Sequence, residues 1–193
     1  KFHFDAGVRQ ETRKELGVAD DVLLIGHVGR FMPQKNQTFL VDVLADLLPK
    51  RPNAMLAFVG DGPDRPAVQQ HAKKLGIANH VLFLGQRSDV NRLYQAFDVF
   101  CLPSLYEGLG IVGVEAQRAG LPCLFADAIT REVDVTGIPR FMTTESYKEW
   151  SSFISALEPG TRIDSSDKAF SGYDISENAR KLTSMYLKLF EKK

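Results

Sequence analysis

Short apolar runs alternate with helical patterns about five times along this 193-residue chain. The runs are nearly continuous, which is typical of strands buried on both faces of a parallel sheet. Strands are expected at residues 22–28, 54–59, 81–84, 99–102 and 121–126. Strands and helices that alternate in this way predict an α/β fold with a doubly wound parallel sheet and short right-handed crossovers.

Helices are expected before the first strand, between the strands and after the last one. They cover residues 10–17, 39–48, 66–75, 90–96, 112–119, 145–157 and 174–190. Gly17 is expected to end the first helix, and Asp89 to cap the fourth. The last helix has a capping box at Asp174–Glu177 and an apolar stripe, and a loop is expected at residues 159–172 before it. The core is expected at about residues 20–142, followed by a helical extension at about residues 143–193.

The composition excludes some partners. Lys plus Arg and Asp plus Glu both total 24, so no bulk field exists to recruit nucleic acid or an anionic membrane. No apolar run approaches the roughly 20 residues that a membrane helix needs. We therefore expect no nucleic-acid partner and no transmembrane segment.

The two cysteines and the N-terminus bear on the compartment. Cys101 and Cys123 each lie in an apolar segment, which favours buried free thiols in a reducing cytoplasm over a disulfide. Lys1–Asp5 has neither an initiator methionine nor a signal-peptide pattern. The length suits one α/β domain. Because the start lacks an initiator methionine, the chain is expected to be a fragment of a longer cytoplasmic protein. Peripheral attachment of that protein to the inner face of the cell membrane is left open.

Residues 103–116 carry two glutamates, Glu107 and Glu115, with seven residues between them. A proline ends the preceding strand, so Glu107 is expected in a loop and Glu115 in the first turns of the next helix. Gly108 and Gly110 allow backbone N–H groups to approach an anion at the helix N-terminus. Such a site suits a ligand that carries both a phosphate and hydroxyls.

This segment resembles the E-x7-E signature of the family-four (group 1) retaining glycosyltransferases, which have the two-domain GT-B architecture. The loop Gly29–Asn36 matches the family's G-R-x4-K pattern, and Gly60–Pro63 matches its G-x-G-P turn. We assign the G-x-G-P turn mainly to backbone shape. We expect Asn36, at the end of the G-R-x4-K loop, to cap the helix at residues 39–48. The resemblance covers residues 22–142 and implies the C-terminal, Rossmann-like, nucleotide-sugar-binding half of such an enzyme. Within the family it is most similar to enzymes of exopolysaccharide or capsule synthesis.

The resemblance also implies roles for four charged residues. In the family, the arginine and lysine of G-R-x4-K contact the donor's diphosphate, which assigns that role to Arg30 and Lys35. Glu107 would face the transferred sugar, and Glu115 would accept hydrogen bonds from the ribose hydroxyls. By the residues alone, a solvated basic loop and a solvated helix residue remain alternatives for these positions.

The remaining candidates would meet the donor through the backbone or by packing. They are Gly85, Gln86, Arg87, Gly108, Leu109, Gly110, Ile111 and Val112. The first three would meet the edge of the nucleobase, and the glycines and N–H groups at 108–111 would meet the sugar or distal phosphate. Val112 would pack against the ribose, with core packing as the alternative. His27 is expected to be packed rather than catalytic.

The implied reaction is transfer of a hexose from a nucleoside diphosphate sugar, UDP- or GDP-linked, to an acceptor hydroxyl with retention. No D-x-D occurs in the chain, which argues against the metal-dependent glycosyltransferases. No cofactor or metal is therefore expected, and Arg30, Lys35 and a helix N-terminus would stabilise the leaving diphosphate. The acceptor site would lie in an N-terminal domain absent from this fragment, which alone is expected to be inactive. Two alternatives stay open: a nucleotide-binding module without catalysis, and a GT-B phosphorylase or epimerase.

Overall fold

The computed structural model describes residues 2–164, 167–173 and 175–190. Its strands are β1 (Leu24–Val28), β2 (Met55–Val59), β3 (Val81–Phe83), β4 (Val99–Leu102), β5 (Cys123–Ala126) and β6 (Arg140–Met142). They form one parallel sheet in the order β3-β2-β1-β4-β5-β6. The order runs outward in both directions from β1 and β4, as in a doubly wound sheet. The predicted fold class is confirmed.

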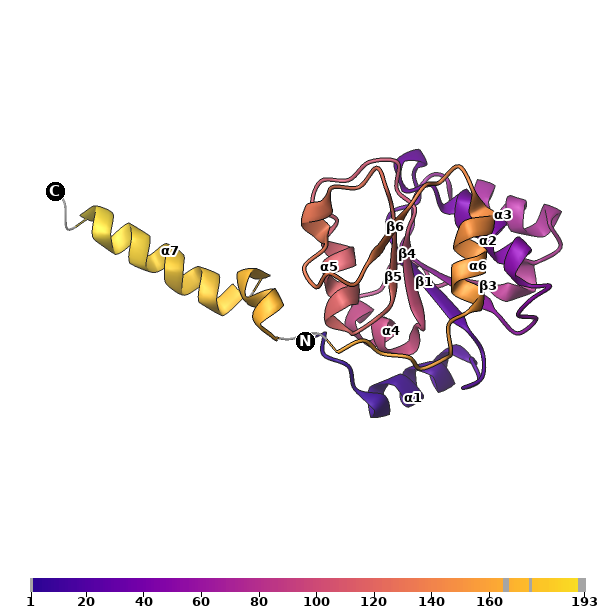
Figure 1. Ribbon diagram of the computed structural model, residues 1–193, viewed down its shortest axis with the longest axis horizontal. Helices are drawn as coiled ribbons and strands as arrows, with labels where there is room; N and C mark the ends of the chain where they lie inside the picture. Colours follow the sequence, from indigo (N-terminus) through magenta and orange to yellow (C-terminus); the bar gives the residue numbers. More distant parts are fainter. Residues whose placement is uncertain (1, 165–166, 174, 191–193) are drawn as a thin grey trace.

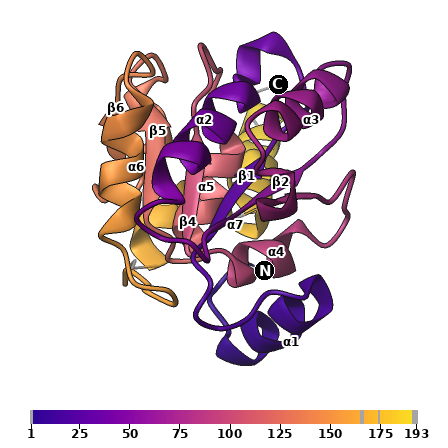
Figure 2. The same ribbon diagram turned by 90° about the vertical axis from the view of Figure 1, so that its right-hand side faces the viewer.

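Helices cover both faces of this sheet. They are α1 (Ala6–Leu16), α2 (Gln37–Leu47), α3 (Arg65–Lys74), α4 (Val90–Ala96), α5 (Ile111–Arg118), α6 (Tyr147–Ser155) and α7 (Ile175–Phe190). Short 3-10 helices are η1 (Pro33–Lys35), η2 (Ala78–His80), η3 (Arg131–Val133) and η4 (Asp167–Tyr173). Helices α2, α3 and α6 lie on one face, and α4 and α5 lie on the other with α1 beside α4 (Figures 1 and 2).

Two layers of apolar side chains fill the space between sheet and helices. Successive residues of a strand point to opposite faces, so Ile25 packs in the α2–α3–α6 layer and Leu24 in the α4–α5 layer. Trp150 and Ile154 of α6 are fully buried in the first layer. Core packing therefore continues past residue 142, into the segment expected as a helical extension.

The cysteines lie in these layers. Cys101 and Cys123 are buried free thiols, as predicted. Burial raises the pKa of both thiols above the ordinary value, so they stay protonated and unreactive.

The structure corrects the sequence analysis at the edge of the fold. Strand β6 has no counterpart among the predicted strands, because it is three residues long and begins with the exposed Arg140. The predicted loop at residues 159–172 is wrong in part, since η4 begins inside it at Asp167 and ends just beyond it at Tyr173. Asp174, and with it the predicted capping box, lies outside the described residues.

Helix ends show one confirmed prediction and one error. Gly17 ends α1 in the left-handed conformation, as predicted. The helix begins earlier than expected, because Oδ1 of Asp5 accepts a hydrogen bond from the N–H of Val8 at 2.9 Å. Asp89 is the N-cap residue of α4, as predicted, but the expected side-chain bond is missing: its carboxylate instead accepts two hydrogen bonds from Arg87, at 2.7 and 2.6 Å.

Asp98, just before β4, joins both ends of the domain. Its fully buried carboxylate accepts hydrogen bonds from Arg9 (2.6 Å) and Arg13 (3.1 Å) of α1. It also accepts from the backbone N–H groups of Leu24 and Gly160, each at 2.8 Å. A buried charge is tolerable when it is paired and fully bonded, and these four donors meet that condition.

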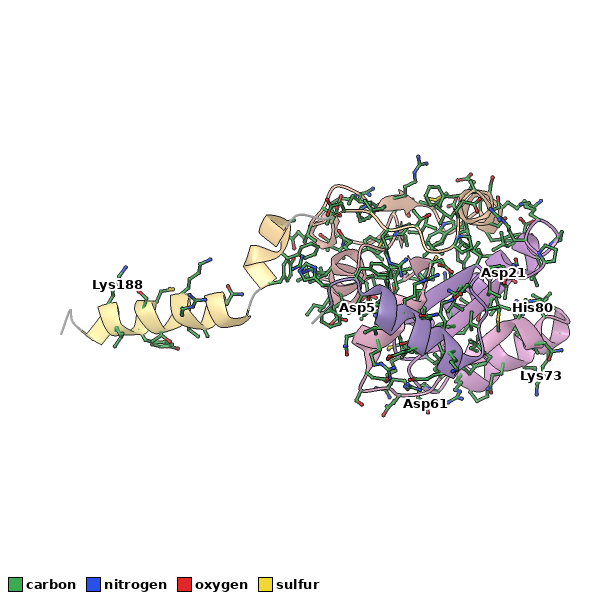
Figure 3. The ribbon with its side chains drawn as sticks, turned by 90° about the horizontal axis from the view of Figure 1, so that it is seen from below. Asp5, Asp21, Asp61, Lys73, His80 and Lys188 are labelled. Atoms are coloured by element: carbon green, nitrogen blue, oxygen red, sulfur yellow. The ribbon has the colours of Figure 1, made fainter. Side chains whose placement is uncertain are left out.

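Helix α7 projects away from the domain (Figure 1), and Figure 3 marks Lys188 on it, far from the packed side chains. Four of its apolar side chains are exposed: Leu182, Met185, Tyr186 and Leu187. Within the described ranges, no helix has the length and apolar character needed to cross a membrane.

Candidate functional site

The loops after β1, β2, β3 and β4 meet at the carboxyl edge of the sheet. Backbone hydrogen bonds join them, from Phe31 N to Asp61 O (3.0 Å), from Gly60 N to Gly85 O (2.8 Å) and from Leu105 N to Gln34 O (2.8 Å). In open α/β sheets, ligands bind at this edge where the strand order reverses, which here is between β1 and β4.

A pocket of about 700 Å³ opens at this edge, lined by Arg30, Gly60, Asp61, Gly62 and Gln86. A second hollow of about 310 Å³ shares two of these residues and extends along the loops, lined by Val28, Gly29, Val59, Gly60, Gln86, Arg87 and Val90. The structure thus brings Arg30, Gln86 and Arg87 of the predicted site to one continuous depression. Asp61, labelled in Figure 3, is a lining residue that sequence reasoning did not include.

The G-x-G-P turn packs directly on the loop that carries Arg30. Gly60 has φ +131°, and a Cβ built there would lie 2.1 Å from the carbonyl oxygen of Gly29. A Cβ at Gly62 would lie 2.2 Å from the carbonyl oxygen of Phe31. No side chain fits at either position, so both glycines are needed for the close backbone contact, and the same turn lines the pocket.

Lys35 and Glu107 form an ion pair across the site. Nζ of Lys35 and Oγ of Ser104 both donate to Oε1 of Glu107, the latter at 2.7 Å. The two charged side chains are only 16% and 8% exposed, so the pair is largely desolvated. Ser104 is a site residue that the sequence analysis missed, although its position directly after a strand-ending proline marks it.

The loops that carry this pair are joined by two further side-chain bonds. Nε2 of Gln34 donates to the carbonyl oxygen of Tyr106 at 2.8 Å, and Nδ2 of Asn36 donates to that of Pro103 at 3.3 Å. Asn36 has a left-handed backbone (φ 53°, ψ 40°), and its side chain makes no cap on α2. Asn36 is the N-cap residue of α2, as expected, but the side-chain hydrogen bond of a cap is missing.

His27 is packed on β1, as predicted. Its Nδ1 donates to the carbonyl oxygen of Cys101 at 2.9 Å, and within the described residues its Nε2 has no partner. Burial lowers the pKa of His27 to about 4, with a smaller effect of the same sign from the Lys35 ammonium. This imidazole is therefore neutral at ordinary pH.

Helix α5 presents its N-terminus to the same edge. Gly110 precedes it with φ 65° and ψ 50°, and its carbonyl oxygen accepts a hydrogen bond from the N–H of Gly113 at 2.7 Å. The N–H groups of Ile111 and Val112, at the start of the helix, have no carbonyl one turn earlier in the helix to bind. Glu107 lies in the loop and Glu115 on the helix, as predicted. Val112 is half-buried beside the apolar core, and Oε2 of Glu115 accepts a hydrogen bond from the buried Tyr94 at 3.1 Å.

The loop after β3 is held in shape from two sides. Gly85 has φ 66°, and its carbonyl oxygen accepts a hydrogen bond from the N–H of Gly60. The Arg87 guanidinium donates to the Asp89 carboxylate through two nitrogens. These hydrogen bonds raise the pKa of Arg87 above its ordinary value. Among the residues that the structure describes, no three His, Cys, Asp or Glu side chains lie close enough together to hold a metal ion.

Comparison with known proteins assigns the chain to a family. The family described as "Glycosyl transferases group 1" matches residues 8–135, which include the loops of the site. This chain belongs to the group 1 glycosyltransferases. The match confirms the predicted resemblance.

Similar proteins support the assignment. A Bacillus subtilis (strain 168) protein named as a glycosyltransferase, EpsF, is 37% identical over 182 residues, 91% of this chain and 47% of that protein. The Anabaena protein Alr3699/HepE, solved in complex with UDP, superposes with a TM-score of 0.71 at 29% identity, over 79% of this chain and 43% of that one. WaaG, described as a glycosyltransferase involved in lipopolysaccharide biosynthesis, gives a TM-score of 0.70 at 27% identity, over 78% and 42%. The chain thus spans about half the length of these similar proteins.

Proposed function

We propose that this chain is the donor-binding half of a retaining hexosyltransferase that uses a nucleoside diphosphate sugar. The observation that carries the proposal is the pocket beside Arg30, at the strand-order reversal of a group 1 glycosyltransferase. The UDP complex of the similar Anabaena protein supports a nucleoside diphosphate as the ligand.

The diphosphate would lie between the loop after β1 and the N-terminus of α5. Arg30 supplies a planar guanidinium for phosphate oxygens, and Lys35 supplies a compact charge on the same loop. The N–H groups at Gly110 and Ile111 add partial positive charge at the end of a helix. When the sugar leaves, charge grows on the diphosphate, and these donors are already in place to stabilise it without a metal ion.

Glu107 would change its partner when the donor binds. With no ligand present it accepts from Lys35 and Ser104. A diphosphate competes with Glu107 for Lys35, and the carboxylate, still held by Ser104, then faces the hydroxyls of the transferred sugar. In this scheme the ion pair keeps Lys35 at the phosphate position before the ligand arrives.

The nucleoside would occupy the smaller hollow. Its lining by Val28, Gly29 and Val90 offers an apolar floor, and Gln86 and Arg87 bring backbone groups to the edge of a base. Glu115 would accept from two ribose hydroxyls, and Val112 beside it would contact the ribose ring. Gly108 and Leu109 complete the turn over the sugar.

The other half of the reaction needs a second domain. We propose that an N-terminal domain of the longer protein binds the acceptor, because the chain spans about half the length of its relatives. Alone, this domain would bind donor but not transfer sugar, since transfer requires both reactants in near-attack geometry without water. The role of the similar protein WaaG in lipopolysaccharide biosynthesis supports cell-surface polysaccharide synthesis as the pathway class, with the enzyme at the cytoplasmic side of the membrane.

A panel titration tests the proposal. Calorimetry and ligand-observed NMR with UDP, GDP and ADP, and with their glucose conjugates, should give a dissociation constant of about 1 μM to 1 mM for one nucleotide. NMR contacts should appear in the loops at residues 29–36 and 85–87. The absence of binding to every nucleotide at millimolar concentration would overturn the donor-site proposal.

A further inference from the structure

A buried tyrosine on α4 holds the carboxylate of Glu115 from inside the fold. Oη of Tyr94 lies 3.1 Å from Oε2 of Glu115 and 3.1 Å from the carbonyl oxygen of Val112. A phenol donates one proton, and both acceptors lie in the first turns of α5. The contact therefore links α4 to the part of α5 that carries Glu115.

The ring of Tyr94 is itself fixed. It makes edge-on contacts with Phe2, Phe97 and Phe100, at centroid distances of 5.9, 6.1 and 5.7 Å. The residue is fully buried, and a buried tyrosine hydroxyl needs a partner within the protein. Burial, and next the charge of Glu115, raise the pKa of Tyr94 well above its ordinary value, so its hydroxyl remains a donor.

The same helix also reaches the smaller hollow. Val90, the first residue of α4, lines that hollow, and Tyr94 follows one turn later on the same side of the helix. Helix α4 thus contacts the hollow with its first turn and Glu115 with its second. A nucleoside in the hollow and the carboxylate would be placed by one rigid element.

We propose that Tyr94 is a positioning residue that orients the Glu115 carboxylate for the ribose hydroxyls of the donor. This inference rests on the proposed function, in which Glu115 binds the ribose. A glutamate side chain that must stop rotating when a ligand binds loses affinity through entropy. A bond to one carboxylate oxygen from a rigid ring fixes that rotation in advance, so the ligand meets an ordered acceptor.

The test compares UDP with 2′,3′-dideoxy-UDP, which lacks both ribose hydroxyls, by calorimetry on the full chain. Tyr94→Phe should weaken UDP binding about threefold to tenfold and leave the dideoxy ligand nearly unchanged. Glu115→Ala should remove the preference for UDP, and Tyr94→Phe added to it should change nothing more. Tyr147→Phe on α6 makes the same atomic change away from the site and should keep the full preference.

The outcomes separate the two proposals. If Glu115→Ala abolishes the preference and Tyr94→Phe retains it, the positioning role is overturned while the donor site stands. Equal loss of both ligands in Tyr94→Phe would show a merely structural role and would also overturn it. If Glu115→Ala retains the preference, the ribose role of Glu115 fails, and the role of Tyr94 fails with it.

Discussion

Lys35 and Glu107 are bound to each other although 72 residues separate them in the chain. One follows β1 and the other follows β4, and these strands are neighbours only because the sheet is doubly wound. The fold therefore brings the two predicted charges together, and the pair sits where the strand order reverses. Both charged side chains are largely shielded from water, so each charge needs the other as its partner to offset the cost of burial.

This pair predicts opposite effects for its two members. Glu107→Gln should strengthen UDP binding several-fold, because it removes the carboxylate that competes for Lys35 and repels phosphate. Lys35→Ala should weaken UDP binding about tenfold or more, because a charge-assisted bond is lost. Calorimetry on both variants measures this, and equal changes of the same sign would contradict the proposed exchange of partners. In the full-length enzyme, Glu107→Gln should nevertheless lower sugar transfer.

Arg30 should act on the phosphates alone. Arg30→Ala should weaken UDP binding about tenfold but leave uridine binding unchanged, since the side chain is exposed at the larger pocket. Glu115→Ala should weaken both ligands, because both carry the ribose. Paired titrations of UDP and uridine provide the measurement. A similar loss for uridine in Arg30→Ala would show that the phosphate assignment is wrong.

Two glycines should differ sharply in their tolerance of a methyl group. Gly60→Ala should lower the free energy of unfolding by about 2 kcal/mol or more, because the new Cβ meets the carbonyl oxygen of Gly29 and the backbone has a positive φ. Gly108→Ala should change it by less than about 0.5 kcal/mol, since a Cβ there meets nothing within 4 Å. Urea unfolding of both variants tests the contrast, which would fail if they were equally stable.

Stability should depend on pH through His27. The native pKa of His27 is about 4 and the ordinary value is 6.5, so below pH 6.5 the unfolded chain binds a proton that the native chain does not. This group alone should reduce the free energy of unfolding by up to about 3 kcal/mol as the pH falls from about 6.5 to about 4. Denaturation of His27→Phe over this range should show a shallower decline. Identical slopes would mean that the native His27 binds its proton in the ordinary range.

Donor binding should not require a divalent ion. The two cations of the loop after β1 and the N-terminus of α5 are proposed to supply the positive charge that a metal supplies elsewhere. EDTA should therefore leave the UDP dissociation constant within about twofold of its value without chelator. Affinity that disappears with EDTA and returns with Mg²⁺ or Mn²⁺ would reveal a metal requirement.

The sequence predicts most of the sheet because the inner strands are buried on both faces. Leu23, Leu24 and Ile25 are all buried, and such an uninterrupted short apolar run is typical of a strand that is covered on both faces of a parallel sheet. Strand β6 escapes detection because it lies at the edge, where Arg140 is exposed and only three residues pair.

The candidate site residues also fall into two groups, those that a sequence motif points to and those whose contacts depend on the fold. Arg30 and Glu115 stand in motifs with fixed local spacing, so the sequence alone is enough to propose them as site residues. The contacts of Asn36 and Tyr94 depend on which loops and helices become neighbours, and local spacing carries no such information. A buried tyrosine does carry one usable signal, since its hydroxyl must find a partner, but the identity of that partner requires the fold.

The carboxylate of Asp98 also decides where this domain can be cut or exchanged. Arg9 and Gly160 approach it from opposite ends of the sequence, and both donors lie outside residues 20–142. A chimaera that exchanged only the sheet and its loops between two glycosyltransferases would leave a buried negative charge with foreign neighbours. A unit that can be exchanged intact must therefore include α1 and the segment after α6 as far as Gly160, because both supply hydrogen-bond donors to this carboxylate.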